Sequence, residues 1–88
     1  MPLISSFYGI LIYMFKELNS PHKKPHVHAV FAGVKFSIGF DGEILAGSLP
    51  RKQQKLVEAW VALHEDELQA SWIALNENNE VLKIKGLE

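Results

Sequence analysis

Three of the four histidines in this chain, His22, His26 and His28, lie within seven positions of the segment S-P-H-K-K-P-H-V-H-A-V-F, residues 20–31. His26 and His28 are two apart on an expected strand, so their side chains point to the same face and can bind one ion. His22, on the preceding loop, would supply a third nitrogen for a divalent transition metal such as zinc or nickel. With a bound water, such a site would give a metal-dependent hydrolase or nuclease.

The fourth histidine, His64, lies within the apolar sector of an expected helix. It would approach His26 and His28 if the histidine face of the strand is the one that the helix covers. The opposite face, with Val27 and Ala29, is more apolar and competes for the core. The sequence leaves these two arrangements open, and a histidine in a core is usually hydrogen-bonded without binding a ligand.

Charge is distributed unevenly along the chain. Residues 1–55 contain seven Lys and Arg against three Asp and Glu, whereas residues 56–88 contain two against seven. A basic patch that could contact nucleic acid is formed in sequence by Lys23, Lys24, Arg51, Lys52 and Lys55. An ordinary solvated surface explains the same pattern, and a nucleic-acid binder would lose affinity steeply as salt rises.

Four strands are expected in the first half of the chain: residues 7–16, 26–31, 34–40 and 43–47. The first is apolar on both faces, which is typical of a central strand or of one that another chain covers. The third alternates clearly between apolar and small or polar residues. Turn residues follow at Ala32-Gly33 and Asp41-Gly42. This order predicts an antiparallel meander.

A helix is expected from Pro50 to about residue 77, because no glycine or proline interrupts residues 51–77. Its main apolar sector contains Leu56, Val57, Trp60, Val61, His64, Leu68, Trp72 and Leu75. A second, weaker stripe contains Ala59, Ala62, Leu63, Ala70 and Ile73. Two apolar faces on a helix that packs on one small sheet predict a second contact partner.

The predicted fold is therefore α+β: an antiparallel sheet of four to five strands packed against one long C-terminal α-helix, with residues 81–85 as a short last strand. The length of 88 residues fits a single domain, 1–88. Absence of cysteine is compatible with a reducing cytoplasm. No apolar run approaches the roughly 20 residues that span a bilayer, and the apolar start lacks the basic region of a signal peptide.

Other catalytic motifs are not found. Without cysteine the chain has no thiol nucleophile, its glycines are scattered at turns, and no serine has the G-x-S-x-G context of a nucleophile elbow.

Several short motifs together resemble the small bacterial domain of unknown function 4160 family. They are S-x-F-Y-G-I at residues 5–10, P-H-V-H-A at residues 25–29, and L-P-x-x-Q-x-x-L-V-x-x-W with the following L-H-x-x-E-L and W at residues 49–72. The family pattern P-P-H-F-H matches at His26 and His28, whereas His22 belongs to a loop that is longer and more basic here. The resemblance implies a compact bacterial protein, often encoded beside another small protein and sometimes labelled a transcriptional regulator or toxin-antitoxin component. It implies no enzymatic activity.

These observations favour a non-enzymatic interaction or regulatory module that acts as a homo-oligomer or with a small co-encoded protein. The two alternatives are the metal-dependent enzyme built on His26 and His28 and the nucleic-acid binder built on the basic patch.

Overall fold

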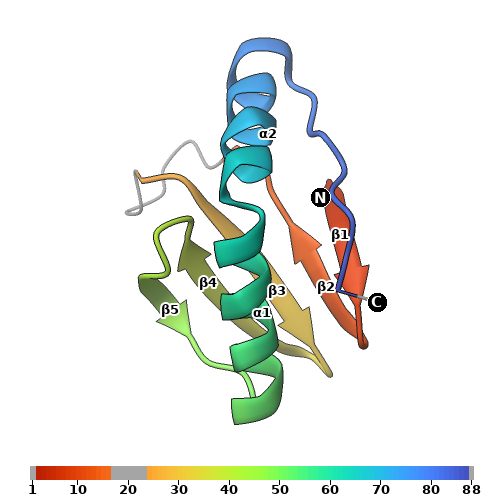
Figure 1. Ribbon diagram of the computed structural model, residues 1–88, viewed down its shortest axis with the longest axis vertical. Helices are drawn as coiled ribbons and strands as arrows, with labels where there is room; N and C mark the ends of the chain where they lie inside the picture. The colour runs from red at the N-terminus through yellow and green to blue at the C-terminus, as the bar shows by residue number, and fades with distance from the viewer. Residues whose placement is uncertain (1, 17–23, 88) are drawn as a thin grey trace.

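A computed structural model describes residues 2–16 and 24–87. Its elements are the strands β1 (Leu3–Phe7), β2 (Ile10–Tyr13), β3 (His26–Phe31), β4 (Val34–Gly39) and β5 (Ile44–Gly47), followed by the helices α1 (Arg51–Leu63) and α2 (Glu65–Asn78). The five strands form one antiparallel sheet in chain order, and both helices cross the same side of it (Figure 1). The predicted α+β meander is confirmed.

The first strand of the prediction is wrong, because residues 7–16 contain a hairpin turn. Tyr8 and Gly9 both have positive φ, 49° and 78°, and connect β1 to β2. A two-residue turn with positive φ at both positions matches the right-handed twist of the strands. Gly9 was the sequence signal for this turn, but a tyrosine at the first position is an uncommon choice. The strand added to the four expected ones is therefore β1, at the N-terminal end of the meander.

The later hairpins agree with the prediction. Ala32 and Gly33, with φ of 50° and 81°, connect β3 to β4 in the same way. The β4–β5 turn contains Asp41 and Gly42, and the Asp41 carboxylate accepts a hydrogen bond from the Glu43 backbone N–H. At Gly47, where φ is 72°, a Cβ atom would lie 2.3 Å from the Lys35 carbonyl oxygen. The close approach of β5 to β4 therefore requires glycine there.

The core lies between the helices and one side of the sheet, which we call the inner side. Paired residues on neighbouring strands share a side, and the pairs Phe7–Ile10, Ile12–Ala29, Ala29–Phe36 and Val27–Ile38 are buried on the inner side. The helices contribute Val57, Trp60, Val61, Leu68 and Leu75 to the same core. The apolar sector predicted for the helix is therefore largely the one that packs on the sheet.

The prediction of one long helix is wrong. His64, with φ of −116° and ψ of 25°, separates α1 from α2. Glu65, Asp66 and Glu67 occupy the first turn of α2, where carboxylates interact favourably with the helix dipole. Three acidic residues in succession are thus the signal for a helix start within the stretch predicted as one helix. The end of α2 agrees with the prediction, since Asn79 has the left-handed conformation, φ 57°, that is common after a helix.

Residues 81–85 do not form the predicted last strand. They run beside β1 (Figure 1), and the Ile84 N–H donates to the Ile4 carbonyl at 2.8 Å. Side chains from the helices hold this segment: the Trp60 indole N–H donates to the Lys85 carbonyl, and the Ser71 hydroxyl accepts from the Leu82 N–H. No helix within residues 2–16 and 24–87 is both long and apolar enough to cross a membrane.

Candidate functional site

His26 and His28 lie side by side at the start of β3, with ring centroids 5.0 Å apart. His26 is only 3% exposed, and its Nδ1 is 2.8 Å from the Lys24 carbonyl oxygen, to which it donates a hydrogen bond. The centroid of its ring also lies 5.7 Å from the ring centroid of Trp72 on α2. His26 is therefore held on several sides as a structural residue at the end of the sheet.

His28 is half-buried and has different surroundings. Its Nδ1 forms a hydrogen bond of 3.1 Å with the Ser37 hydroxyl on the neighbouring strand β4. The Phe15 ring stacks on it with centroids 4.5 Å apart and planes inclined by 13°. Neither contact was predicted from the sequence, although strand pairing of residues 28 and 37 follows from the hairpin at Ala32-Gly33.

His64 lies between the two helices and forms a hydrogen bond to the first turn of α2. Its Nδ1 donates a hydrogen bond of 2.5 Å to the Glu67 carboxylate, and its ring is 5.5 Å from that of Trp60. Within the described part of the chain, no three His, Asp or Glu side chains are arranged to hold a metal ion. His22 lies outside the described residues, so a metal site that includes it stays a prediction.

The basic residues of the predicted nucleic-acid patch are distributed over two ends of the molecule. Lys24 lies just before β3, and its ammonium group is 2.7 Å from Asp41 and 3.4 Å from Glu43. Arg51, Lys52 and Lys55 lie at the start of α1, at the opposite end of the sheet (Figure 1). Lys23 is outside the described residues.

The ion pair between Lys24 and Asp41 shifts the pKa of each group so that its charged form is favoured. The hydrogen bond from Lys24, together with that from the Glu43 backbone, lowers the pKa of Asp41 below its usual range. The hydrogen bond to Asp41 and the nearby Glu43 carboxylate raise the pKa of Lys24. The Asp41 side chain is mostly in solvent and the Lys24 side chain is half-buried, so the pair connects residue 24 to the β4–β5 turn without forming a fully buried site.

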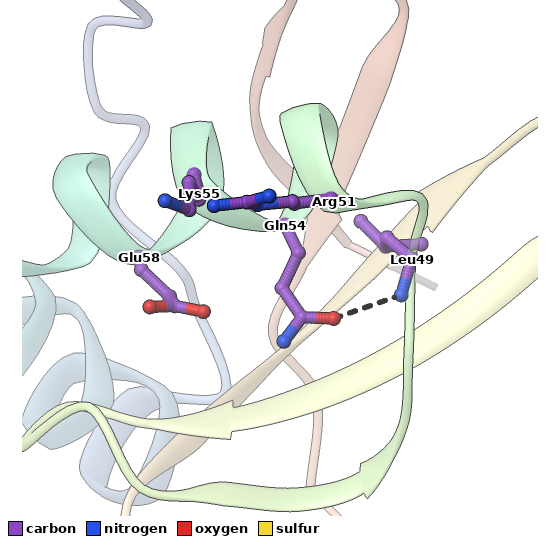
Figure 2. Close-up of a pocket in the computed structure, with 5 residues that line it drawn as sticks. All are labelled: Leu49, Arg51, Gln54, Lys55 and Glu58. Atoms are coloured by element: carbon purple, nitrogen blue, oxygen red, sulfur yellow. Dashed lines mark hydrogen bonds between the residues drawn. The ribbon is translucent and has the colours of Figure 1, made fainter.

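A hollow of about 290 Å³ lies beside the first turns of α1 (Figure 2). Leu49, Arg51, Gln54, Lys55 and Glu58 line it. The Gln54 side-chain oxygen accepts a hydrogen bond of 3.1 Å from the Leu49 N–H, which connects the helix to the segment before it. Glu58 offsets part of the positive charge of Arg51 and Lys55, and the hollow has the character of a mixed polar surface.

One apolar feature of the surface is the side of the sheet that faces away from the helices, which we call the outer side. Its apolar residues are Leu3, Leu11, Tyr13, Phe15 and Val30, identified by the pairs Leu3–Tyr13 and Leu11–Val30 and by the stacking of Phe15 on His28. Leu3 is 38% exposed and Leu11 36%, and the other three are half-buried. The two-sided apolar pattern of residues 7–16 was the sequence signal for this surface.

A second apolar feature lies on the helices, on the side opposite the core. Leu63 is 71% exposed and Ile73 53%, and Ala59, Ala62 and Ala70 are exposed near them. These five residues are the weaker stripe expected from the sequence. The helices therefore bury one apolar sector and present the other to solvent.

Comparison with known families shows a match. The family described as "Domain of unknown function (DUF4160)" matches residues 9–73, which include β2 to β5, α1 and part of α2. No curated protein and no solved structure matches the chain. The histidine pair at residues 26 and 28 lies within the matched region, whereas β1 and the C-terminal segment lie outside it. Because the match covers well over half of its residues, the chain belongs to the DUF4160 family.

Proposed function

We propose that this protein is a non-enzymatic protein-interaction module that acts in an oligomer or with a small co-encoded protein, and that the outer side of the sheet is its contact surface. The resemblance stated from sequence gives the proposed setting, a small bacterial operon of regulatory or toxin-antitoxin type. A cytoplasmic location is part of the same proposal.

One observation carries the proposal: an apolar, partly aromatic sheet side that neither helix covers. A contiguous exposed apolar patch on a small domain is typical of a site that another macromolecule covers. Aromatic side chains such as Tyr13 and Phe15 are enriched in the centres of protein interfaces, whereas Lys and Glu are depleted there. The apolar residues of the outer side are concentrated on β1, β2 and β3, next to each other in the sheet.

One member of the histidine pair, His28, has a structural role in this surface. His28 belongs to the outer side and holds Phe15 by stacking, while Ser37 holds His28 by a hydrogen bond. These contacts restrict the Phe15 ring before any partner binds. A side chain that is already ordered loses less rotamer entropy on association.

The experiment compares Leu11→Arg with Ile44→Arg by size-exclusion chromatography with light scattering over a range of concentrations. Leu11 is 36% exposed on the outer side, and Ile44 is 43% exposed but paired with the buried Ile38 of the inner side. We expect Leu11→Arg to remove at least one association step of the native protein, because it places a charge in the centre of the contact. Ile44→Arg should associate as the native protein does.

Circular dichroism spectra and melting curves of both variants establish that each is folded. The proposal is wrong if the native protein is a monomer at all concentrations and purifies without a bound protein from cells that express its neighbouring genes. Equal association of Leu11→Arg and native protein, with the same co-purifying proteins, also excludes the outer side as the contact.

A further inference from the structure

A hollow of about 490 Å³ lies between the β1–β2 turn and the first turns of α1. The described residues that line it are Tyr8 from the turn and Lys52, Gln53 and Leu56 from the helix. The turn and the start of the helix lie at the same end of the sheet (Figure 1). The volume is within the range of about 300–1,000 Å³ that is usual for small-molecule sites in proteins.

Tyr8 forms the aromatic wall of this hollow, and its place in the turn is unusual for a large side chain. It has φ of 49°, a conformation in which asparagine, aspartate and glycine are the common residues. Ala32 has φ of 50° at the equivalent position of the β3–β4 turn, so this kind of turn does not require an aromatic ring. Residues in unfavourable backbone conformations are concentrated at functional sites. Tyr8 is also 52% exposed, so much of its surface faces solvent and is available for a ligand.

The helix supplies three different kinds of side chain to the other wall. Leu56 is half-buried and packs against the core, which gives the hollow an apolar part. Gln53 is half-buried, and its amide can both donate and accept hydrogen bonds. Lys52 is exposed and adds a positive charge. The first turn of α1 contains no acidic residue that would offset this charge.

We propose that this hollow binds a nucleoside monophosphate unit, either as a free nucleotide or as part of a single-stranded nucleic acid. The base stacks on the Tyr8 ring, the Gln53 amide bonds the edge of the base, and the Lys52 ammonium group binds the phosphate.

The combination of lining groups selects this class of ligand. Bases stack on aromatic side chains whatever their sequence, and a glutamine amide can bond the edge of adenine through two hydrogen bonds. A lysine ammonium group binds phosphate as a compact positive charge. An uncharged aromatic ligand would leave Lys52 without a contact, and inorganic phosphate would make no use of Tyr8 or Leu56.

The site is separate from the outer side of the sheet, so the inference goes beyond the proposed function and does not depend on it. It also divides the predicted basic patch. Arg51 and Lys55 line the other hollow beside α1, together with Glu58 (Figure 2), whereas Lys52 lines the hollow at Tyr8. The positive charge at the start of α1 therefore serves two different surfaces.

The experiment is a nuclear magnetic resonance titration of the ¹⁵N-labelled protein with adenosine monophosphate. We expect shifts of the amides at residues 8, 9, 52, 53 and 56 and a dissociation constant on the order of 0.1–1 mM, as for a small ligand in an open site. Adenosine and inorganic phosphate should each bind about ten times more weakly, because each lacks half of the contacts. A 5′-phosphorylated deoxyadenosine hexamer should shift the same amides. Tighter binding of the hexamer than of the mononucleotide identifies a nucleic acid as the source of the ligand, and weaker binding identifies a free nucleotide.

Two substitutions of Tyr8 test the stacking without disturbing the turn. Tyr8→Asn removes the ring and introduces a residue that favours positive φ, so the variant should melt no lower than the native protein. Its affinity for adenosine monophosphate should fall about tenfold, because the base loses its stacking partner. Tyr8→Trp keeps an aromatic ring and should bind at least as tightly as the native protein.

A pair of lysine substitutions tests the phosphate contact. Lys52→Gln should weaken binding of adenosine monophosphate about tenfold and leave binding of adenosine unchanged. Lys55→Gln is the matched control, because it removes the same charge from an exposed lysine of the same helix that lines the other hollow. It should change the affinity less than about twofold, since the remaining effect is long-range and screened by salt.

Several outcomes would overturn the inference. They are the absence of amide shifts at about 5 mM adenosine monophosphate, shifts confined to other parts of the chain, and unchanged affinity in Tyr8→Asn. Equal losses in Lys52→Gln and Lys55→Gln would also overturn it, because they would indicate attraction to the general positive charge of the helix start. None of these results bears on the outer side of the sheet, which the Leu11 and Ile44 comparison tests.

Discussion

The two sides of the sheet are built from the same strands but have different surroundings. On the inner side Ile12, Ala29 and Ile38 are fully buried by the helices, whereas on the outer side Leu11 and Leu3 keep more than a third of their surface in solvent. In β2 the two classes alternate residue by residue, so the apolar character of a side chain does not tell which side is covered. The helices decide it, because they supply Trp60, Val61 and Leu68 to one side only.

The largest expected effect concerns the centre of the inner side. Trp60 is fully buried, lies 5.5 Å from the Phe7 ring and donates to the Lys85 carbonyl. We expect Trp60→Ala to lower the free energy of unfolding by about 3–5 kcal/mol, because it leaves a large cavity and removes the hydrogen bond. Leu11→Ala on the outer side should cost about 1 kcal/mol or less, since its side chain is already partly in water.

Urea unfolding followed by far-ultraviolet circular dichroism measures both changes. Trp60→Phe is the control, because it keeps most of the packing and loses the indole N–H, and its loss should be clearly smaller than that of Trp60→Ala. If Leu11→Ala destabilised the monomeric protein as much as Trp60→Ala, the distinction between a covered and an uncovered side would be wrong.

The two histidines of β3 differ in their burial and in their hydrogen-bond partners. His26 is buried and bonds the Lys24 carbonyl, whereas His28 is half-buried between Phe15 and Ser37. We expect His26→Ala to lower the free energy of unfolding by about 1–3 kcal/mol, because it removes a buried hydrogen bond and the contact with Trp72. His28→Ala should cost less than His26→Ala.

Thermal unfolding of the two single variants shows which substitution destabilises the protein more. The same samples, titrated calorimetrically with Zn²⁺ and Ni²⁺, test the metal alternative: equal heats for the native protein and a His26→Ala/His28→Ala variant would remove it. A greater loss of stability for His28→Ala than for His26→Ala would contradict this order. It would show that the contacts of His28 with Phe15 and Ser37 stabilise the protein more than the buried contacts of His26 do.

The smallest expected effect is at the exposed turn between β4 and β5. Because the pKa of Asp41 is lowered in the folded protein, its contribution to stability is present above the unfolded value of about 4 and is lost as pH falls through the folded value. Lys24, whose pKa is raised, contributes below its unfolded value of about 10.4 and loses this contribution as pH rises through the folded value. The pair is therefore fully present between these limits.

Nuclear magnetic resonance titration of the Asp41 carboxyl carbon checks the direction. In Lys24→Met the midpoint should move up toward the ordinary aspartate value, and exchange of the amides at residues 42 and 43 should become faster. Overall stability at pH 7 should change little, because Asp41 is exposed and Lys24 is only half-buried, so water screens the ion pair. An unchanged midpoint in Lys24→Met would mean that Lys24 does not set the pKa of Asp41.

Much of the fold followed from local signals. The alternation in residues 34–40 and the turns at Ala32-Gly33 and Asp41-Gly42 identified β3, β4 and β5, and the apolar sector of the helices identified the residues that pack on the sheet. The turn at Tyr8-Gly9 was missed because apolar residues surround it on both sides. The helix break at His64 was missed because the apolar phase continues across it, so only the acidic first turn of α2 marked a new start.

The candidate functional surfaces were harder to predict from the sequence than the fold. Which residues share a face can be predicted from the sequence, since strand alternation and helix rotation are local properties. It could not determine that His26 would be buried against Trp72, that His64 would bond Glu67, or that Lys24 would pair with Asp41, because these contacts join distant parts of the chain or depend on the break between the helices. Which apolar face the helices cover depends on the tertiary fold, because a sheet side and a helix stripe become buried or exposed by the packing of whole elements on one another.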